Sequence, residues 1–191
     1  MTLAERFEYP VALKRAREGG FVVTCRDLPA LVTQGDDRAH ALTEAADAMD
    51  EVFATLMKLG RDLPVASSVR RGEVLVAPPP EAVAKAALYV TLRRSGASKV
   101  ELARRLKIDE KEARRLLDPL YPSKLPRIAD AIALLGGKLV VALERAPASH
   151  ALRMPTSAKV LRHAVSRAAG GNRGGKGRSV SKRTPNSPAK S

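Results

Sequence analysis

The chain has 191 residues, enough for one domain or two small ones, and a formal net charge of +14. Its single cysteine, Cys25, excludes an intramolecular disulfide. No apolar run reaches the length of about 18 residues that a membrane-spanning helix needs. We therefore expect a soluble, cytoplasmic protein with no membrane contact.

The positive charge lies in the C-terminal half. Residues 1–80 contain ten Lys or Arg and twelve Asp or Glu, whereas residues 147–191 contain ten basic residues and no acidic one. A basic segment of this kind favours a polyanionic partner such as nucleic acid. The nearly neutral N-terminal part is free for another task.

Three short strands are expected before residue 36. Apolar residues alternate along 7–15, although Pro10 lacks an N–H and therefore predicts an edge strand. Glu18-Gly19-Gly20 predicts a hairpin turn into a second strand over 21–25. A third strand is expected over 31–34.

One long helix follows, because Gly35-Asp36-Asp37 ends the third strand and supplies an N-cap. Gly60 is expected to end the helix, and a fourth strand is expected over 72–76. The order βββαβ predicts an antiparallel meander with a helix on one face, in an N-terminal domain over residues 1–77. The apolar stripe of the helix recurs at intervals of three and four residues: Leu42, Ala45, Ala46, Met49, Val52, Phe53, Leu56 and Leu59.

This order matches the first part of a ribonuclease H-like fold, whose nuclease chemistry needs carboxylates that converge on divalent metal ions. Asp27 precedes a proline turn, Asp36 and Asp37 start the helix, and the helix carboxylates oppose the apolar stripe. Turn, cap and solvent-facing positions explain these residues without a metal. We therefore expect no catalytic residue, no metal site and no cofactor.

A short proline-rich linker over residues 78–83 is expected between this unit and a second domain over residues 84–146. A helix is predicted from Glu81 to about Arg94, so it starts inside the linker. Two short helices follow it, and a further helix is predicted over 125–135. The fold class is therefore α+β, with a helical second domain.

The two short helices, over residues 98–119, have the pattern of a helix-turn-helix. Ser98 with Glu101, and Asp109 with Glu112, have the spacing of two capping boxes. Lys107 lies in the turn, where the backbone tends to be left-handed, at a cost of about 1 kcal/mol for a side chain other than glycine.

In a helix-turn-helix the second helix lies in the major groove of DNA. We expect its basic face to contact bases or phosphates, and the basic residues of the first helix to contact phosphates. An ordinary helical hairpin with a solvated basic face is the alternative. The expected DNA contacts are Lys111, Arg114 and Arg115, with Lys99, Arg104 and Arg105 on phosphates.

A β-branched run over residues 138–143 predicts a short terminal strand. A lone strand needs a partner, and the same strand of a second copy would supply one. Because each unit has only about 70 residues, a homodimer or tetramer is favoured. Residues 147–191 are rich in Gly, Ser, Pro, Lys and Arg, so a disordered basic tail is expected. That tail either adds non-specific DNA affinity or is a solubilising extension without a role.

Four stretches of residues 4–144 carry a resemblance to a known family: RDLPALVTQGDD, ALTEAADAMDEVF, ALYVTLRRSGASKVELARRLKIDEKEARRLLDP and LPRIADAIALLGGKLVVAL. In these stretches and in their order, the chain resembles a HicB-family antitoxin of the helix-turn-helix type. Ala30 and Leu31 stand where the family usually has glycine and cysteine.

This resemblance implies a type II toxin–antitoxin system. It implies that residues 1–77, a partial ribonuclease H-like fold without catalysis, bind and block a HicA-like toxin that cleaves mRNA. It also implies that the second domain binds operator DNA and represses the operon. A stand-alone regulator is the alternative, in which the N-terminal domain binds a ligand or oligomerises. If residues 1–77 bind a toxin, the expected toxin contacts are Asp27, Asp36, Asp37 and Glu44.

Overall fold

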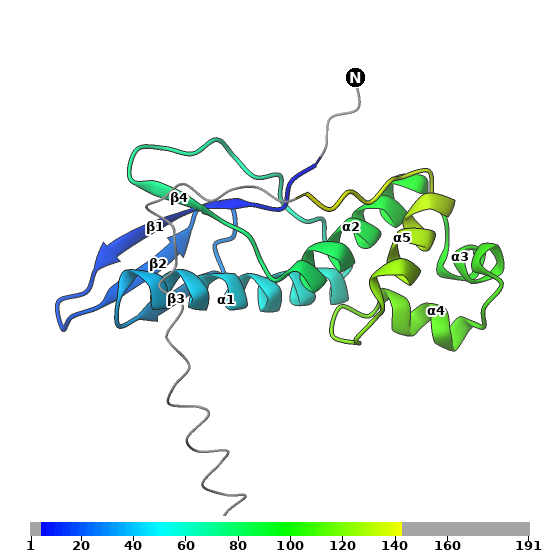
Figure 1. Ribbon diagram of the computed structural model, residues 1–191, viewed down its shortest axis with the longest axis horizontal. Helices are drawn as coiled ribbons and strands as arrows, with labels where there is room; N and C mark the ends of the chain where they lie inside the picture. The colour runs from blue at the N-terminus through cyan, green and yellow to red at the C-terminus, as the bar shows by residue number, and fades with distance from the viewer. Residues whose placement is uncertain (1–4, 143–191) are drawn as a thin grey trace, which may run out of the picture. The chain divides into compact units, whose positions relative to one another are not determined.

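The computed structural model describes residues 5–142, and these residues belong to one compact unit. Figure 1 shows a sheet and its covering helix followed by a group of helices, α2 to α5. This arrangement confirms the α+β class and the order βββαβ of the first five elements. The elements are β1 (Tyr9–Arg15), β2 (Phe21–Cys25), β3 (Val32–Gly35), α1 (Arg38–Lys58), β4 (Glu73–Val76), α2 (Pro80–Ser95), α3 (Lys99–Leu106), α4 (Glu110–Leu117) and α5 (Leu125–Leu134).

The four strands form one antiparallel sheet in the order β3-β2-β1-β4. The predicted meander is correct for β1 to β3 and wrong for β4, which returns after α1 to the far side of β1. The prediction that Pro10 marks an edge strand is also wrong, because β1 is central. Pro10 lies opposite Leu75 of β4, and pairing with β2 begins only at Val11. A proline fits there because its place in the ladder is at the start of the strand.

Helix α1 packs on one face of the sheet and starts as expected. Asp37 is its N-cap and accepts a hydrogen bond from the backbone N–H of His40 at 2.8 Å. Gly35 ends β3 close to the backbone of α1, because a Cβ there would lie 2.4 Å from the backbone nitrogen of Ala41. Gly60 follows the helix with a positive φ of 66°, which confirms it as the stop signal.

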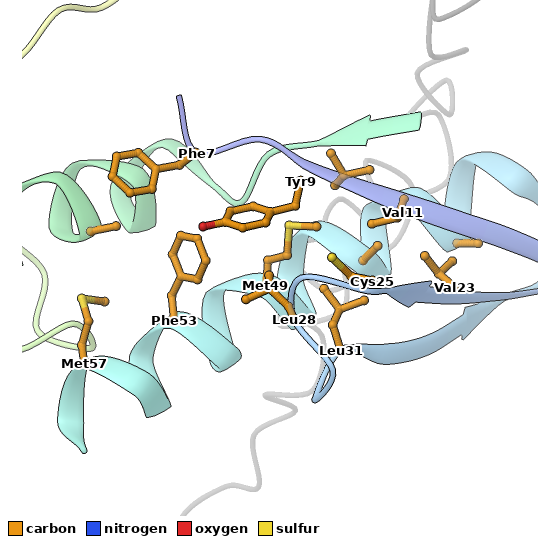
Figure 2. Packing of buried hydrophobic residues seen from close by; sticks show 14 residues of the cluster. Phe7, Tyr9, Val11, Val23, Cys25, Leu28, Leu31, Met49, Phe53 and Met57 are labelled. Atoms are coloured by element: carbon orange, nitrogen blue, oxygen red, sulfur yellow. The ribbon is translucent and has the colours of Figure 1, made fainter. Parts of the chain in front are cut away.

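The sheet and α1 together form the sheet unit, and its core lies between α1 and the strands (Figure 2). The rings of Tyr9, the first residue of β1, and of Phe7 before it contact the ring of Phe53 edge-on, with centroid distances of 5.6 and 6.2 Å. The hydroxyl of Tyr9 donates to the carbonyl of Pro64 at 2.6 Å, and burial raises the pKa of Tyr9 to about 12. Cys25 is buried in this core, whereas Leu59, expected in the apolar stripe, caps the helix and is 61% exposed.

Helix α2 packs against two hydrophobic clusters, the core of the sheet unit and a second cluster among the helices α2 to α5. Its Ala86 belongs to the core of the sheet unit, while Ala84, Leu88 and Leu92 belong to the cluster formed with α3, α4 and α5. The hydroxyl of Tyr89 also donates to the carbonyl of Arg61 at 2.7 Å. Because α2 begins at Pro80, most of the expected linker over 78–83 is helical.

Residues 138–142 form no strand in this single chain, so the terminal strand is not present here. Leu139 packs against the helical cluster, whereas Val140 and Val141 are 66% and 78% exposed. A strand is defined by hydrogen bonds to a neighbour, and the described part of the chain offers none to this segment. Residue 143 and the expected basic tail over 147–191 lie outside the described residues. Within residues 5–142, no helix has the length and apolar character needed to cross a bilayer.

Candidate functional site

Helices α3 and α4 each begin at a side-chain cap that the sequence predicts. The hydroxyl of Ser98 accepts from the N–H of Glu101 at 3.0 Å, and Asp109 accepts from the N–H of Glu112 at 2.6 Å. In a capping box the glutamate side chain also accepts from the backbone N–H of the cap residue. This part of both predictions is wrong, because the two glutamates bind arginines instead. Glu112 pairs with Arg127 of α5, which fixes the first turn of α4 to that helix.

The turn between α3 and α4 is left-handed at Lys107, with φ 55° and ψ 43°. Among residues 5–142, no other residue except glycine has a positive φ. The N–H of Ile108 bonds to the carbonyl of Ala103 at 3.1 Å, so the chain reverses tightly after α3. Leu102, Ala103, Ala113 and Leu116 are buried below this turn and hold the two helices together.

The outer face of α4 carries the three predicted cations, and all three are exposed. Arg114 pairs with Glu110 one turn earlier at 3.1 Å. The guanidinium of Arg115 lies over the ring of Tyr121, 5.3 Å from its centroid. Within the described part of the chain, Lys111 makes no ion pair. This face can therefore present three cations to a polyanion.

The cations of α3 are more constrained. Arg104 and Arg105 both donate to the carboxylate of Glu101, with contacts of 2.8 Å each, and these hydrogen bonds lower the pKa of Glu101 to about 2. Arg105 also reaches the carbonyl of Leu134 at 3.4 Å. Lys99 is exposed and has no ion pair within residues 5–142, so it is the most available cation of this helix.

Asp27 lies apart from the other acidic candidates. Its carboxylate accepts from the backbone N–H of Ser67 at 2.9 Å and from the Ser67 hydroxyl at 2.6 Å. Burial opposes its charge, but these hydrogen bonds outweigh burial and keep the pKa of Asp27 below its ordinary value. Next to it, Arg26 pairs with Glu73 and donates to the carbonyl of Ser68. Asp27 therefore anchors the loop that precedes β4.

The other three acidic candidates surround His40 at the start of α1. His40 accepts from the N–H of Asp36 at 3.2 Å through Nδ1, and its Nε2 lies 3.3 Å from Glu44. Asp37 caps the helix through the N–H of the same histidine. Asp36 has a fully exposed side chain, so the cluster faces solvent. No group of three or more His, Cys, Asp or Glu in the described part of the chain has a metal-binding arrangement.

Residues 8–87 match a family model described as HicB_like antitoxin of bacterial toxin-antitoxin system. Antitoxin HicB of Pseudomonas fluorescens is 33% identical over 142 residues, which cover 73% of this chain and 96% of that protein. The chain belongs to the HicB antitoxin family. Antitoxin HicB of Escherichia coli K12 is 30% identical over 131 residues (69% and 95%), and Antitoxin HicB 1 of Photorhabdus laumondii is 28% identical over 142 residues (74% and 90%).

Sequence reasoning missed one polar residue of this HicB-family chain that lies against α4. Lys85 of α2 is 5% exposed, and its Nζ donates to the carbonyl of Leu116 at 2.7 Å and to the hydroxyl of Ser123 at 2.8 Å. Burial lowers the pKa of Lys85 to about 8. The available signal was a single lysine inside the alanine-rich run AVAKAAL.

Proposed function

We propose that this chain is the antitoxin of a type II toxin–antitoxin pair. It binds and neutralises a HicA-like toxin that cleaves mRNA, and it represses its own operon in the cytoplasm by binding operator DNA. Membership of the HicB family supports the antitoxin role, because the matched family model and the related proteins are described as antitoxins. The proposal includes no catalytic residue, no metal and no cofactor.

DNA binding is assigned to α3 and α4 as a helix-turn-helix, with α4 as the helix that enters the major groove. The observation that carries this assignment is the left-handed turn at Lys107 between two capped helices. The face of α4 that is left exposed carries Lys111, Arg114 and Arg115. Arginine and lysine are the side chains that contact guanine edges and phosphates most often. On α3, Lys99 is the expected phosphate contact, with Arg104 and Arg105 beside it.

Toxin binding is assigned to the sheet unit, which we propose to be a partial ribonuclease H-like fold that has no catalysis. The cluster of Asp36, Asp37 and Glu44 around His40 is the proposed contact surface, because its carboxylates face solvent and suit a basic partner. Asp27 is proposed to act indirectly, because its carboxylate is engaged by Ser67.

Oligomerisation is assigned to residues 138–143. Val140 and Val141 are exposed, and the segment lacks a strand partner within the described chain. Pairing with the same segment of a second copy would bury these side chains and form a homodimer, or a tetramer when toxin-binding units also associate. A dimer would present two copies of α4 to successive major grooves of a palindromic site.

The test uses the full chain, because α2 packs on both hydrophobic clusters and cutting the chain beside it would expose one of them. Lys111→Ala with Arg114→Ala should abolish binding to the DNA upstream of the gene and leave capture of a HicA-like protein intact. Asp36→Asn with Glu44→Gln should abolish capture of the HicA-like protein and leave DNA binding intact. DNA binding without toxin capture by the wild type would instead support a stand-alone regulator with an N-terminal ligand or oligomerisation domain.

A further inference from the structure

The C-terminal end of α4 depends on a side chain from another helix. The last carbonyls of a helix lack partners within it, and they form the negative end of its dipole. The N–H of Asp118 bonds to the carbonyl of Arg114 at 2.9 Å and to that of Arg115 at 3.3 Å. The carbonyl of Leu116 receives the ammonium of Lys85 instead, at 2.7 Å, and that of Arg115 lies 3.4 Å from the same nitrogen.

Lys85 reaches this point from α2 through a buried path. It is the only buried charged side chain among residues 5–142. Removing a charged group from water is unfavourable unless hydrogen bonds replace the lost hydration, and here three acceptors from α4 and the following loop surround the ammonium. A charged residue held in this way is a polar link between α2 and α4.

The same ammonium also supports the loop after α4. It donates to the hydroxyl of Ser123, and that hydroxyl donates to the carbonyl of Tyr121 at 3.3 Å. The ring of Tyr121 lies beneath the guanidinium of Arg115. Lys85 therefore contacts the backbone of Arg115 on one side and, through Ser123, the segment that carries its aromatic support on the other.

We propose that Lys85 is a positioning residue for DNA binding, which fixes the C-terminal end of α4 and the loop after it so that Arg115 faces the DNA. This inference rests on the DNA-binding function proposed above. The first turn of α4 is held independently by the pair of Glu112 with Arg127. Loss of Lys85 should therefore loosen the end of α4 that carries Arg115 and leave its start in place.

The protonation of Lys85 gives this role a pH signature. Its pKa of about 8 is set by burial, which favours the neutral amine, and Asp118 partly opposes that shift. Among residues 5–142, Asp118 is the charged residue that contributes to this shift, while Arg115 carries one of the acceptor carbonyls and Lys124 follows Ser123 in the chain. Arg127 on α5 is paired with Glu112. A neutral amine is a weaker partner for the helix dipole, and DNA phosphates favour the protonated form. DNA affinity should therefore fall as the pH rises through about 8.

The experiment measures fluorescence anisotropy of a labelled fragment of the DNA upstream of the gene, with the full-length protein, from pH 6.5 to 9.5. Lys85→Met should bind about tenfold more weakly at pH 7, as expected when a hydrogen-bonded charge is lost, and its pH profile should be flatter than that of the wild type. Lys14→Met is the matched control, because it removes the same charge from an exposed position on β1. It should keep the slope of the wild-type profile.

Ser123→Ala keeps the test decisive if Lys85→Met fails to fold. This variant removes one acceptor of the ammonium, so DNA affinity should fall and its pH-dependent loss should begin at lower pH. Folded variants that bind with the affinity and pH profile of the wild type would overturn the role of Lys85 alone. A wild type that fails to bind the fragment at any pH would overturn the proposed DNA-binding function, and this inference with it.

Discussion

The guanidinium of Arg115 lies 5.3 Å from the centre of the Tyr121 ring, at the exposed end of α4. A cation above an aromatic face at an exposed site gains about 0.5–1 kcal/mol. The ring also limits the rotamers of a long side chain that would otherwise be mobile. The contact therefore prepares one of the proposed DNA-binding residues before DNA arrives.

Replacing Arg115 should weaken binding to the upstream DNA by about 1–3 kcal/mol if it reads a base, with relaxed specificity at one position. Tyr121→Ala should weaken binding less, because the cation remains but loses its support. Tyr121→Phe is the matched control, since it keeps the ring and should bind as the wild type does. The measurement is anisotropy on the natural fragment and on single-base variants of it. Unchanged affinity in Arg115→Ala would remove this residue from the interface.

Lys107→Gly should stabilise the protein by about 1 kcal/mol, because glycine adopts a positive φ without steric cost. Lys107→Ala is the comparison, since it removes the same side-chain charge and keeps the Cβ. The measurement is the free energy of unfolding from urea denaturation of both variants. Equal stability of the two variants would mean that the left-handed turn is not strained.

Gly35→Ala should destabilise the protein by about 1–3 kcal/mol, because the new Cβ would meet the backbone of α1 at Ala41. The obstructing atoms are backbone nitrogen and Cα, so Ala41→Gly should not restore the loss. Thermal unfolding of the single and double variants checks both statements. Wild-type stability in Gly35→Ala would show that α1 can shift away from β3 at little cost.

A rise in pH through the pKa of Lys85 should increase the free energy of unfolding and decrease the affinity for DNA. Its pKa is about 8 in the folded chain, against an ordinary value of 10.5, so the unfolded chain binds more protons between these values. The free energy of unfolding should therefore gain a contribution that rises from pH 8 to 10.5, while DNA affinity falls over the start of that range. Urea denaturation of the wild type and Lys85→Met at several pH values measures the difference. A slope that is the same in both proteins would contradict the assigned pKa.

Local signals in the sequence predicted the local features of the fold. Asp37, Ser98 and Asp109 are N-caps as expected, and Lys107 is left-handed as expected, because these features depend on neighbours within four residues. The position of Pro10 was misread, because the suitability of a proline depends on where pairing with the next strand begins.

The features that sequence reasoning missed depend on residues distant in the chain. Asp27 binds Ser67, 40 residues later, and Lys85 binds Leu116, 31 residues later. A capping box predicts where a glutamate could bond, but not that Arg127 of another helix would bind Glu112 first. Helix α2 likewise packs on two clusters, which include residues that lie far from it in the chain.

Neutralisation of a ribonuclease by this chain can be measured as protection of an mRNA from cleavage by a HicA-like protein. The purified toxin is incubated with a defined mRNA while the full-length chain is titrated, with the Asp36→Asn, Glu44→Gln variant as control. We expect cleavage to stop once the wild-type chain reaches stoichiometric amounts, whereas the variant should require a large excess. Cleavage that continues at full rate in excess wild-type chain would contradict the antitoxin function.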